Sequence, residues 1–410
     1  MTLPACRHCM APLPQVFLDL GHAPPSNAYL SPDRLNAPEL TFPLRLRVCE
    51  SCWLVQTEDF AQADQLFDAD YAYFSSTSKS WLDHAARYAA DMITRLGLGA
   101  ASHVIEVASN DGYLLRNFVA AGVPCLGVEP TASTAAAAEA LGIPVIREFF
   151  GESLGRQLAA QGRAADLIAG NNVYAHVPDI NDFTAGLAAA LKPEGVITLE
   201  FPHLMRLVEF CQFDTVYHEH FSYLSALTVA RIFGAAGLRI FDIQELPTHG
   251  GSLRVFGCHR GATHPETAAA RAVLAEERRL GMDRADFYTG FQVRADAVKN
   301  GLLRFLLDAK RDGKRVAAYG AAAKGNTLLN YAGVKPDLLP FVCDAAPSKQ
   351  GKLMPGSHIP ILPPSVLEEQ RPDYLLILPW NIADEVRGQL AGLAARGTRF
   401  VTAVPEVRIV

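Results

Sequence analysis

The middle of the chain alternates short apolar runs with longer amphipathic stretches. The apolar runs predict strands at 103–108, 125–129, 145–146, 166–170 and 195–201, and the stretches at 81–96, 113–121 and 133–141 predict helices. Strands that alternate with helices are typical of a parallel sheet covered by helices on both faces. We therefore expect a doubly wound α/β domain in this part of the chain.

A second alternation of the same kind begins near Arg315. It predicts strands at 316–320, 341–344, 374–378 and 399–401, and a helix that begins at Lys324. A charged, helical stretch at 265–309 connects the two alternating regions. The pattern predicts three domains, at 1–68, 69–262 and 263–410, the last two of them α/β.

The first 68 residues have a different character, with two pairs of cysteines and many prolines. Cys6-x-x-Cys9 and Cys49-x-x-Cys52 each place two thiolates on one tight turn, and two such turns can close a tetrahedral Zn²⁺ site. Apolar residues between the pairs are too few for an independent core, so the metal would supply folding energy. We expect a structural zinc module with no open coordination position. Two unrelated turns or a redox pair are the alternatives.

Composition narrows the possible partners. A length of 410 residues exceeds what one core usually supports, and 20% charged residues is ordinary for a globular protein. A formal net charge of -6 disfavours nucleic-acid binding, which needs a basic surface. Residues 1–10 lack signal-peptide features, and no apolar run reaches the roughly 18 residues of a membrane span. We expect a cytoplasmic protein without a membrane partner, as a monomer or weak homo-oligomer.

The first predicted strand of the central domain ends in Glu106-Val-Ala-Ser-Asn-Asp-Gly112, and the second ends in Glu129. Ligands of open α/β sheets bind at the carboxyl ends of the strands, where a turn of small residues exposes backbone amides. An acidic residue about twenty positions later can accept hydrogen bonds from ribose hydroxyls. The loop has Gly112 but no GxGxxG spacing, which disfavours a nicotinamide cofactor. S-adenosylmethionine is favoured, with another nucleotide or a structural turn as alternatives.

Two histidine-containing segments carry the candidate chemistry. His176 lies just beyond the predicted strand at 166–170, where catalytic residues of such sheets gather. Tyr217-His-Glu-His220 places four titratable side chains in an apolar flank, which is costly without a purpose. Histidine is the usual general base, and tyrosine can donate to a developing oxyanion. We predict acid–base chemistry here. Metal ligation and structural packing remain alternatives.

Two glycine-containing loops are candidate ligand contacts. Thr248-His-Gly-Gly-Ser252 combines hydroxyl, imidazole and flexible backbone. Gly320-Ala-Ala-Ala-Lys-Gly-Asn-Thr327 is a predicted strand-to-helix turn with a lysine, which suits a phosphate, although the order of a P-loop is absent. An ordinary turn is the alternative in each case.

In combination, these motifs resemble the nucleotide-deoxysugar C-methyltransferases, such as the tetronitrose C3′-methyltransferase. The resemblance covers nearly the whole chain and rests on the paired cysteines and on the following segments: Glu106-Val-Ala-Ser-Asn-Asp-Gly-Tyr-Leu-Leu, Asn172-Val-Tyr-Ala-His-Val-Pro-Asp, Tyr217-His-Glu-His-Phe-Ser-Tyr-Leu, Thr248-His-Gly-Gly-Ser-Leu-Arg-Val and Tyr319-Gly-Ala-Ala-Ala-Lys-Gly-Asn-Thr. Ala108 is a mild departure, because many methyltransferases have glycine there. The resemblance implies an N-terminal zinc module, a Rossmann-like S-adenosylmethionine domain and a C-terminal Rossmann-like domain.

The resemblance also implies a substrate and binding residues. The substrate would be a nucleotide-linked 4-keto-6-deoxysugar, typically carried by thymidine diphosphate, held between the last two domains. S-adenosylmethionine would bind at the cofactor loop with Glu106, and at Asn110, Gly112, Glu129 and Asn172. Substrate contacts would come from Tyr71 or Tyr73, Thr248, Gly250, Ser252, Lys324 and Asn326, and the structural zinc would be held by Cys6, Cys9, Cys49 and Cys52.

Methylation at carbon requires removal of a proton next to a ketone, which gives an enolate. We expect His220 to be the base and Glu219 to orient it, while Tyr217 and His176 stabilise the enolate oxygen. The sequence leaves open whether His220 or Tyr217 is the base. O- or N-methylation of a small molecule, a nucleotide-sugar sensor without turnover, and hydride transfer are the rival functions.

Overall fold

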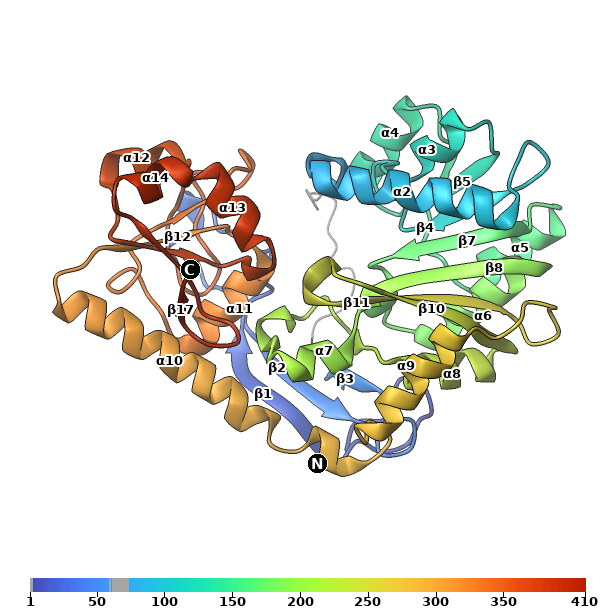
Figure 1. Ribbon diagram of the computed structural model, residues 1–410, viewed down its shortest axis with the longest axis horizontal. Coiled ribbons are helices and arrows are strands. Elements are labelled where there is room, and N and C mark those ends of the chain that lie inside the picture. The colour runs from blue at the N-terminus through green and yellow to red at the C-terminus, as the bar shows by residue number, and fades with distance from the viewer. Residues whose placement is uncertain (1–2, 59, 61–73) are drawn as a thin grey trace.

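The computed structural model describes residues 3–58, 60 and 74–410, and contains three sheets (Figure 1). An antiparallel sheet near the N-terminus has the order β1-β2-β3-β9. Its strands are β1 (Gln15–Ala23), β2 (Phe42–Val48), β3 (Val55–Thr57) and β9 (Ser222–Tyr223). Because β9 comes from the middle of the chain, a central segment completes the N-terminal sheet.

The central domain is built on a seven-stranded sheet of order β10-β11-β8-β7-β4-β5-β6. Its strands are β4 (Val104–Val107), β5 (Cys125–Val128), β6 (Val145–Ile146), β7 (Ala165–Asn171), β8 (Leu191–Pro202), β10 (Leu238–Leu246) and β11 (Ser252–His259). The five strands from β6 to β8 run parallel, whereas β11 pairs antiparallel with both β8 and β10. The sheet is therefore parallel as predicted, with an antiparallel edge that the strand–helix alternation did not indicate.

The central part of the chain contains the three helices that the sequence predicts, α2 to α4, and further helices that it did not indicate. They are α2 (Lys79–Leu96), α3 (Leu115–Ala120), α4 (Ala132–Ala140), α5 (Glu152–Ala160), α6 (Ile180–Ala190), α7 (Leu204–Glu209) and α8 (Ala226–Ala235). Helix α2 begins where the Ser78 side chain accepts a hydrogen bond from the Trp81 amide, and ends at Gly97 in the left-handed conformation. Short 3₁₀ turns add η2 (Ser75–Thr77), η3 (Tyr174–His176), η4 (Phe213–Thr215) and η5 (Thr248–Gly250).

The C-terminal domain has a six-stranded sheet of order β14-β13-β12-β15-β16-β17, parallel except for β17. Its strands are β12 (Val316–Tyr319), β13 (Val342–Cys343), β14 (Ile361–Leu362), β15 (Tyr374–Ile377), β16 (Arg399–Thr402) and β17 (Arg408–Ile409). Its helices are α11 (Ala323–Ala332), α12 (Ser365–Gln370), α13 (Ala383–Gln389) and α14 (Ala391–Ala395), with η7 (Trp380–Ile382) after β15. The predicted second α/β fold is confirmed.

Two helices connect the domains, α9 (Ala268–Arg279) and the long α10 (Phe291–Arg311), and the 3₁₀ turn η6 (Ala285–Tyr288) lies between them. A further 3₁₀ turn, η1 (Pro32–Arg34), lies in the N-terminal region. In Figure 1, α10 runs along β1 and the C-terminal sheet. The Phe17 and Phe291 rings stack with centroids 4.8 Å apart. One apolar cluster includes β1, β2, α10 and α11. The N-terminal sheet thus shares its core with the C-terminal domain, which explains its low apolar content.

The arrowheads of β7 and β8 point toward the C-terminal domain (Figure 1), so the carboxyl ends of these strands face the other α/β sheet. No helix in the described parts of the chain is both long and apolar enough to cross a membrane. The domain bounds given above stay a prediction.

Candidate active site

The four cysteines of the two CxxC motifs converge in the N-terminal module. Their Sγ atoms all lie within 4.8 Å of one another, with 3.5 Å between Cys6 and Cys52 and 3.4 Å between Cys9 and Cys49. These distances exceed the roughly 2.05 Å of a disulfide, so the thiols are separate. Gln56 Nε2 donates to Cys6 Sγ at 3.2 Å, which suits a thiolate. The set fits a tetrahedral Zn²⁺ with no position left for a reactant.

The cysteine module packs against both segments that carry candidate catalytic histidines. Arg7, which lies between Cys6 and Cys9, donates from Nη1 to the Pro178 carbonyl at 2.8 Å, two residues after His176. Strand β3 of the module pairs with β9, which begins two residues after His220. Zinc-module contacts therefore locate the two histidine segments relative to each other.

His220 is buried and its ring packs against Tyr217 and His176, with centroids 3.9 and 4.6 Å away. Its Nδ1 lies 3.1 Å from the Thr215 carbonyl, and because a carbonyl can only accept, Nδ1 is the donor. Nε2 is therefore the nitrogen that can take a proton. Burial lowers the pKa of His220 well below its ordinary value, and the charge of His176 acts in the same direction. The ring is neutral at pH 7, as a base must be.

His176 lies in η3, directly after β7, as the sequence predicts. Burial lowers the pKa of His176 to about 4, against the opposing effect of a hydrogen bond with the backbone of Glu219. A neutral imidazole has one N–H, and the hydrogen bond with the backbone of Glu219 uses it, so the other ring nitrogen of His176 is an acceptor. This arrangement does not favour the predicted donation from His176 to an enolate oxygen. The structure still brings His176, Tyr217 and His220 into one cluster.

Glu219 has a different partner from the one expected. Asn27 Nδ2 donates to both carboxylate oxygens of Glu219, at 3.0 and 2.9 Å, while the Thr215 carbonyl holds His220 Nδ1. The structure corrects the expectation that Glu219 orients His220, because the turn between Tyr217 and His220 directs neighbouring side chains to different partners. Burial raises the pKa of Glu219 to about 7, although the bond from Asn27 opposes this shift. Sequence reasoning missed Asn27, which lies 192 residues away.

The other histidine of the motif, His218, points away from the cluster. Its Nε2 donates to the Phe42 carbonyl of β2 at 3.3 Å. Within the described part of the chain, Cys6, Cys9, Cys49 and Cys52 are the residues whose ligand atoms lie close enough together to hold a metal ion. No residue of the segment 217–220 belongs to such a group of described residues. The metal alternative for this segment has no support in the geometry.

The predicted cofactor loop follows β4 and contains three residues with positive φ: Ala108 (55°), Asn110 (49°) and Gly112 (78°). Glu129, at the end of β5, accepts from the Asn110 amide through Oε2 and from the Thr131 amide through Oε1, both at 2.9 Å. These bonds fix the loop against the second strand of the sheet.

Several polar atoms around this loop are buried without a hydrogen-bond partner in the described part of the chain. They are Ser109 Oγ, Asp111 Oδ1 and, at the end of β7, Asn172 Oδ1. Buried polar groups are nearly always paired in a complete complex, so these atoms fit a polar ligand such as S-adenosylmethionine. Asn172 is one of the residues predicted to bind it.

Glu106 and Gly112 contribute to the packing beneath the predicted cofactor loop. Glu106 is fully buried, and burial raises its pKa well above the ordinary value while the Tyr113 hydroxyl lowers it. A Cβ on Gly112 would lie 2.5 Å from Ile143 Cδ1 and 3.2 Å from Ala138 Cβ. Gly112 is therefore required for packing the loop against α4 as well as for its positive φ.

Asn172 connects the cofactor loop to the segment 248–252. Its backbone N–H donates to the Glu200 carbonyl at 2.7 Å, and Nδ2 donates to His249 Nε2 at 3.1 Å. His249 adopts a left-handed φ of 54°, and its ring lies 5.6 Å from that of Trp81 on α2. Burial lowers the pKa of His249 to about 4, so this ring is neutral as well.

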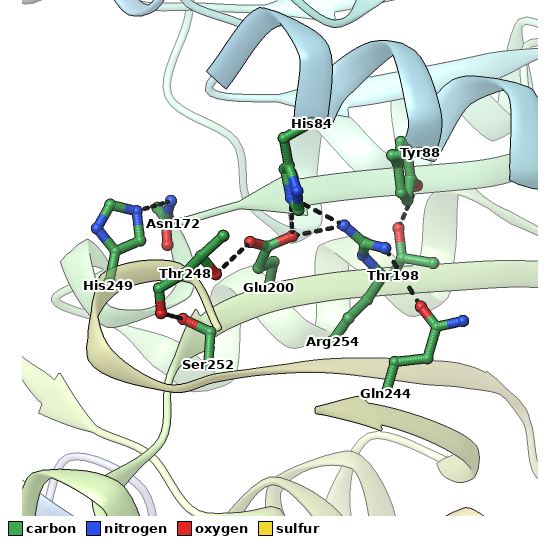
Figure 2. Close-up of polar contacts among 10 residues, drawn as sticks. All are labelled: His84, Tyr88, Asn172, Thr198, Glu200, Gln244, Thr248, His249, Ser252 and Arg254. Carbon is green, nitrogen blue, oxygen red and sulfur yellow. Dashed lines mark hydrogen bonds and ion pairs between the residues drawn. The ribbon is translucent and has the colours of Figure 1, made fainter. Parts of the chain in front are cut away.

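A buried network lies beneath this segment (Figure 2). Glu200 Oε1 accepts from Thr248 Oγ1, and Oε2 accepts from His84 and Arg254. Sequence reasoning did not single out His84, Glu200 or Arg254. A glutamate at the end of the apolar run 195–201 was a usable signal, because an unpaired buried charge is costly.

Two of the predicted substrate residues in segment 248–252 have internal partners. Ser252 Oγ donates to the Thr248 carbonyl at 2.9 Å. Gly250 accepts through its carbonyl from Gln212 Nε2 at 2.7 Å, and a Cβ on Gly250 would lie 2.4 Å from Trp380 Cη2. This segment therefore forms part of the contact between the central and C-terminal domains.

On the C-terminal side, Lys324 lies at the start of α11, with Nζ 2.6 Å from Asn381 Oδ1 and 4.8 Å from the centroid of the Trp380 ring. Trp380 Nε1 donates to buried Asp214 at 2.7 Å. Asn326 is only 1% exposed, and its Nδ2 donates to the Ser26 carbonyl at 2.6 Å. Asn326 thus joins α11 to the N-terminal module in this arrangement, whereas Lys324 lies at the domain contact. Tyr71 and Tyr73 lie outside the described residues.

Three family models match successive parts of the chain. They are described as "Putative zinc binding domain" over residues 6–67, "Methyltransferase domain" over 81–243 and "C-methyltransferase C-terminal domain" over 247–405. C-methyltransferase NovU of Streptomyces niveus is 35% identical over 372 residues, which cover 91% of this chain and 88% of NovU.

Solved structures match up to about half of the chain at low identity. The magnesium protoporphyrin IX methyltransferase of Synechocystis PCC 6803, with bound S-adenosylmethionine, is 14% identical, with a TM-score of 0.33, over 43% of this chain and 79% of that one. The 1,6-didemethyltoxoflavin-N1-methyltransferase of Burkholderia thailandensis is 17% identical, with a TM-score of 0.36, over 50% of this chain and 95% of that one.

Proposed function

The chain belongs to the C-methyltransferase family and is an S-adenosylmethionine-dependent methyltransferase. On that premise we propose that its substrate is a nucleotide-linked 4-keto-6-deoxysugar carried by thymidine diphosphate. The methyl group goes to the carbon next to the ketone, through an enolate. The observation that carries this proposal is the cluster of Tyr217, His176 and buried His220, with His220 neutral and its Nε2 able to accept a proton.

Each step assigned to the protein is a proton transfer or a hydrogen bond. His220 Nε2 removes the proton next to the ketone, and the C–H electron pair forms the C=C bond of the enolate while the carbonyl oxygen gains the negative charge. Tyr217 can donate a hydrogen bond to that oxygen, and the His176 ring packs against His220 beside it. The low dielectric around this partly buried hydroxyl strengthens the bond.

S-adenosylmethionine supplies, when bound, an electrophilic methyl group on a sulfonium. The residues that would hold it are Asn110, Gly112, Glu129 and Asn172, with Glu106 supporting the loop from below. The bond between Asn172 and His249 connects this cofactor region to segment 248–252, which favours a substrate bound beside it.

The substrate would bind between the central and C-terminal domains. Thr248 and its neighbours Gly250 and Ser252 line one side, and the Lys324 cation on the other side suits a diphosphate. Asn326 supports α11, and Tyr71 or Tyr73 would complete the site from outside the described residues. We assign the protein to the cytoplasm, as a monomer or weak homo-oligomer without nucleic-acid or membrane partners.

We assign Zn²⁺ a structural role in the N-terminal module, through Cys6, Cys9, Cys49 and Cys52. Metal analysis of the purified protein should give one zinc per chain, and Cys9→Ser should lose it together with thermal stability, because the metal supplies folding energy to this module. Cys258→Ser, which alters a buried cysteine outside the cluster, is the matched control and should keep the metal. Full zinc occupancy in Cys9→Ser would contradict the assignment.

The test of the reaction is mass spectrometry of the protein incubated with S-adenosylmethionine and thymidine-diphosphate 4-keto-6-deoxyhexose in deuterated buffer. The wild type should give a product heavier by one methyl group and should also catalyse the exchange of hydrogen for deuterium in the unreacted sugar. His220→Asn should slow both by about 100-fold or more, the usual contribution of a general base. Because burial keeps the pKa of His220 well below its ordinary value, wild-type exchange should persist below pH 6.5.

His218→Asn is the control, because His218 faces Phe42 and not the cluster. Methyl transfer without deuterium exchange would indicate O- or N-methylation instead. Exchange at the wild-type rate in His220→Asn would move the base to another group, with Tyr217 the next to test.

A further inference from the structure

Glu200 contacts both the cofactor side and the substrate side of the site. It lies near the carboxyl end of β8 with its side chain fully buried. Its backbone carbonyl accepts from the Asn172 amide at 2.7 Å, and Oε1 accepts from Thr248 Oγ1 at 3.0 Å. One residue therefore joins a predicted cofactor contact to a predicted substrate contact.

The negative charge of Glu200 is compensated from two other elements (Figure 2). Arg254 of β11 donates to Oε2 at 2.7 Å, and His84 of α2 donates to the same oxygen at 2.9 Å. Arg254 is itself held by Gln244 at 3.2 Å and by the Tyr88 ring, 4.5 Å away. Burial alone would raise the pKa of Glu200, but His84 and Arg254 lower it below the ordinary value. The carboxylate is ionised at neutral pH.

An ionised carboxylate fixes the direction of the bond to Thr248. Because the carboxylate can only accept, the Thr248 hydroxyl must donate its single proton to Glu200. The Ser252 hydroxyl bonds to the Thr248 carbonyl and does not use the Thr248 hydroxyl oxygen. The lone pairs of that oxygen are left as acceptors, so a ligand group bound there must be a donor.

We propose that Glu200 is a positioning and specificity-determining residue, which makes Thr248 a hydrogen-bond acceptor for a hydroxyl or amino group of the substrate and excludes the ketone oxygen from that position. The inference rests on the proposed function, since the sugar supplies the donor group. It assigns the ketone to the other side of the site, where the Tyr217 hydroxyl can donate.

Kinetics of Glu200→Gln and Thr248→Val test this assignment. Glutamine keeps the shape of the side chain but can donate its amide N–H to Thr248, and valine removes the hydroxyl. Each variant should raise KM for the keto-sugar by about three- to tenfold, the usual effect of losing one hydrogen bond between neutral groups, with a smaller change in kcat. Calorimetry should give an unchanged Kd for S-adenosylmethionine, because the bond to Asn172 comes from the backbone.

The double variant Glu200→Gln/Thr248→Val separates positioning from general destabilisation. If Glu200 acts through Thr248, the double variant should have the KM of Thr248→Val alone. Glu194→Gln, on the same strand but exposed and bonded to Thr263, is the matched control and should resemble the wild type. Multiplied effects of the two substitutions on KM would overturn the proposal.

Hydrogen–deuterium exchange of the segment 247–252 gives a readout that needs no substrate. Glu200→Gln should speed exchange there, and Glu194→Gln should not, because Glu200 bonds to the Thr248 hydroxyl whereas Glu194 bonds to Thr263. Unchanged exchange in Glu200→Gln would overturn the positioning role, and faster exchange with an unchanged KM would overturn the specificity role. A wild type that methylates no keto-sugar would instead remove the proposed function, while the exchange result still decides whether Glu200 holds the loop.

Discussion

In both parallel sheets a carboxylate at the end of the second strand accepts two backbone hydrogen bonds. Glu129, after β5, accepts from Asn110 and Thr131 at 2.9 Å each. Asp344, after β13, accepts from Ala321 at 2.7 Å and from Ala346 at 2.8 Å. In each case one of the two amides belongs to the loop after the first strand. We call this contact, between the carboxylate after the second strand and the loop after the first strand, the junction of each sheet. The same backbone topology produces it in both domains.

The surroundings of the two carboxylates differ. Lys349 lies 3.7 Å from Asp344 and donates to the Ala321 carbonyl at 2.8 Å, and the Tyr29 hydroxyl donates to that carbonyl as well. Within the described residues, Glu129 takes part in no ion pair, and Ser109 Oγ in the adjacent loop has no partner. The C-terminal junction is thus satisfied by the protein itself, whereas the central one has polar groups left for a ligand. The order of the strands determines where the junction forms. The neighbouring side chains determine whether all of its polar groups have partners within the protein or some are left for a ligand.

Of the substitutions that test this difference between the two sheets, we expect Glu129→Gln to have the largest effect, on the Kd for S-adenosylmethionine. The substitution removes the charge that would face the ribose and one acceptor for the loop amides, so we expect S-adenosylmethionine to bind about 10- to 100-fold more weakly in calorimetry. Asp344→Asn is the matched change in the other sheet. It should leave the Kd unchanged and lower only the melting temperature.

The proposed difference between the two sheets would be wrong if Asp344→Asn weakened the binding of S-adenosylmethionine as much as Glu129→Gln does. It would also be wrong if neither variant changed the Kd for S-adenosylmethionine, because the Glu129 carboxylate would then only hold the loop and would not contact the cofactor.

A smaller effect is expected from Gly112→Ala, measured against Gly142→Ala. Both glycines have a φ of 78°, but a Cβ at Gly112 would lie 2.5 Å from Ile143 Cδ1, whereas nothing lies within 4 Å of a Cβ at Gly142. Gly112→Ala should therefore lower the free energy of unfolding by about 1–3 kcal/mol more than Gly142→Ala, the cost of overpacking. Chemical denaturation measures this difference. Equal losses would mean that backbone strain alone accounts for the need for glycine at the cofactor loop.

Local patterns were sufficient for much of the fold. The strand–helix alternation predicted β4, β5, β7, β12 and β15, because buried strands need apolar runs and covering helices need amphipathic ones. The cysteine spacing predicted the cluster of four thiols, because two tight turns limit where their sulfur atoms can lie. Strand ends predicted the cofactor loop and the position of His176, since the carboxyl ends of parallel strands lie along one edge of the sheet.

Contacts between distant segments could not be predicted in this way. The antiparallel pairing of β9 with β3 joins a central segment to the N-terminal sheet, and no local pattern specifies such a partner. The bond from Asn27 to Glu219 and the buried network around Glu200 likewise depend on side chains that meet only after the domains have packed.

The sequence by itself therefore determined which elements form, where the thiols gather and which strand ends carry polar residues. Only the tertiary structure decided that Thr215 holds His220 Nδ1, that Glu219 pairs with Asn27, and that Lys349 satisfies the second junction while the first is left for a ligand. The physical reason is the range of the interactions. Periodicity and turn chemistry act over a few residues, whereas the hydrogen bonds that orient a buried side chain depend on whichever segments the packed core brings within 3 Å.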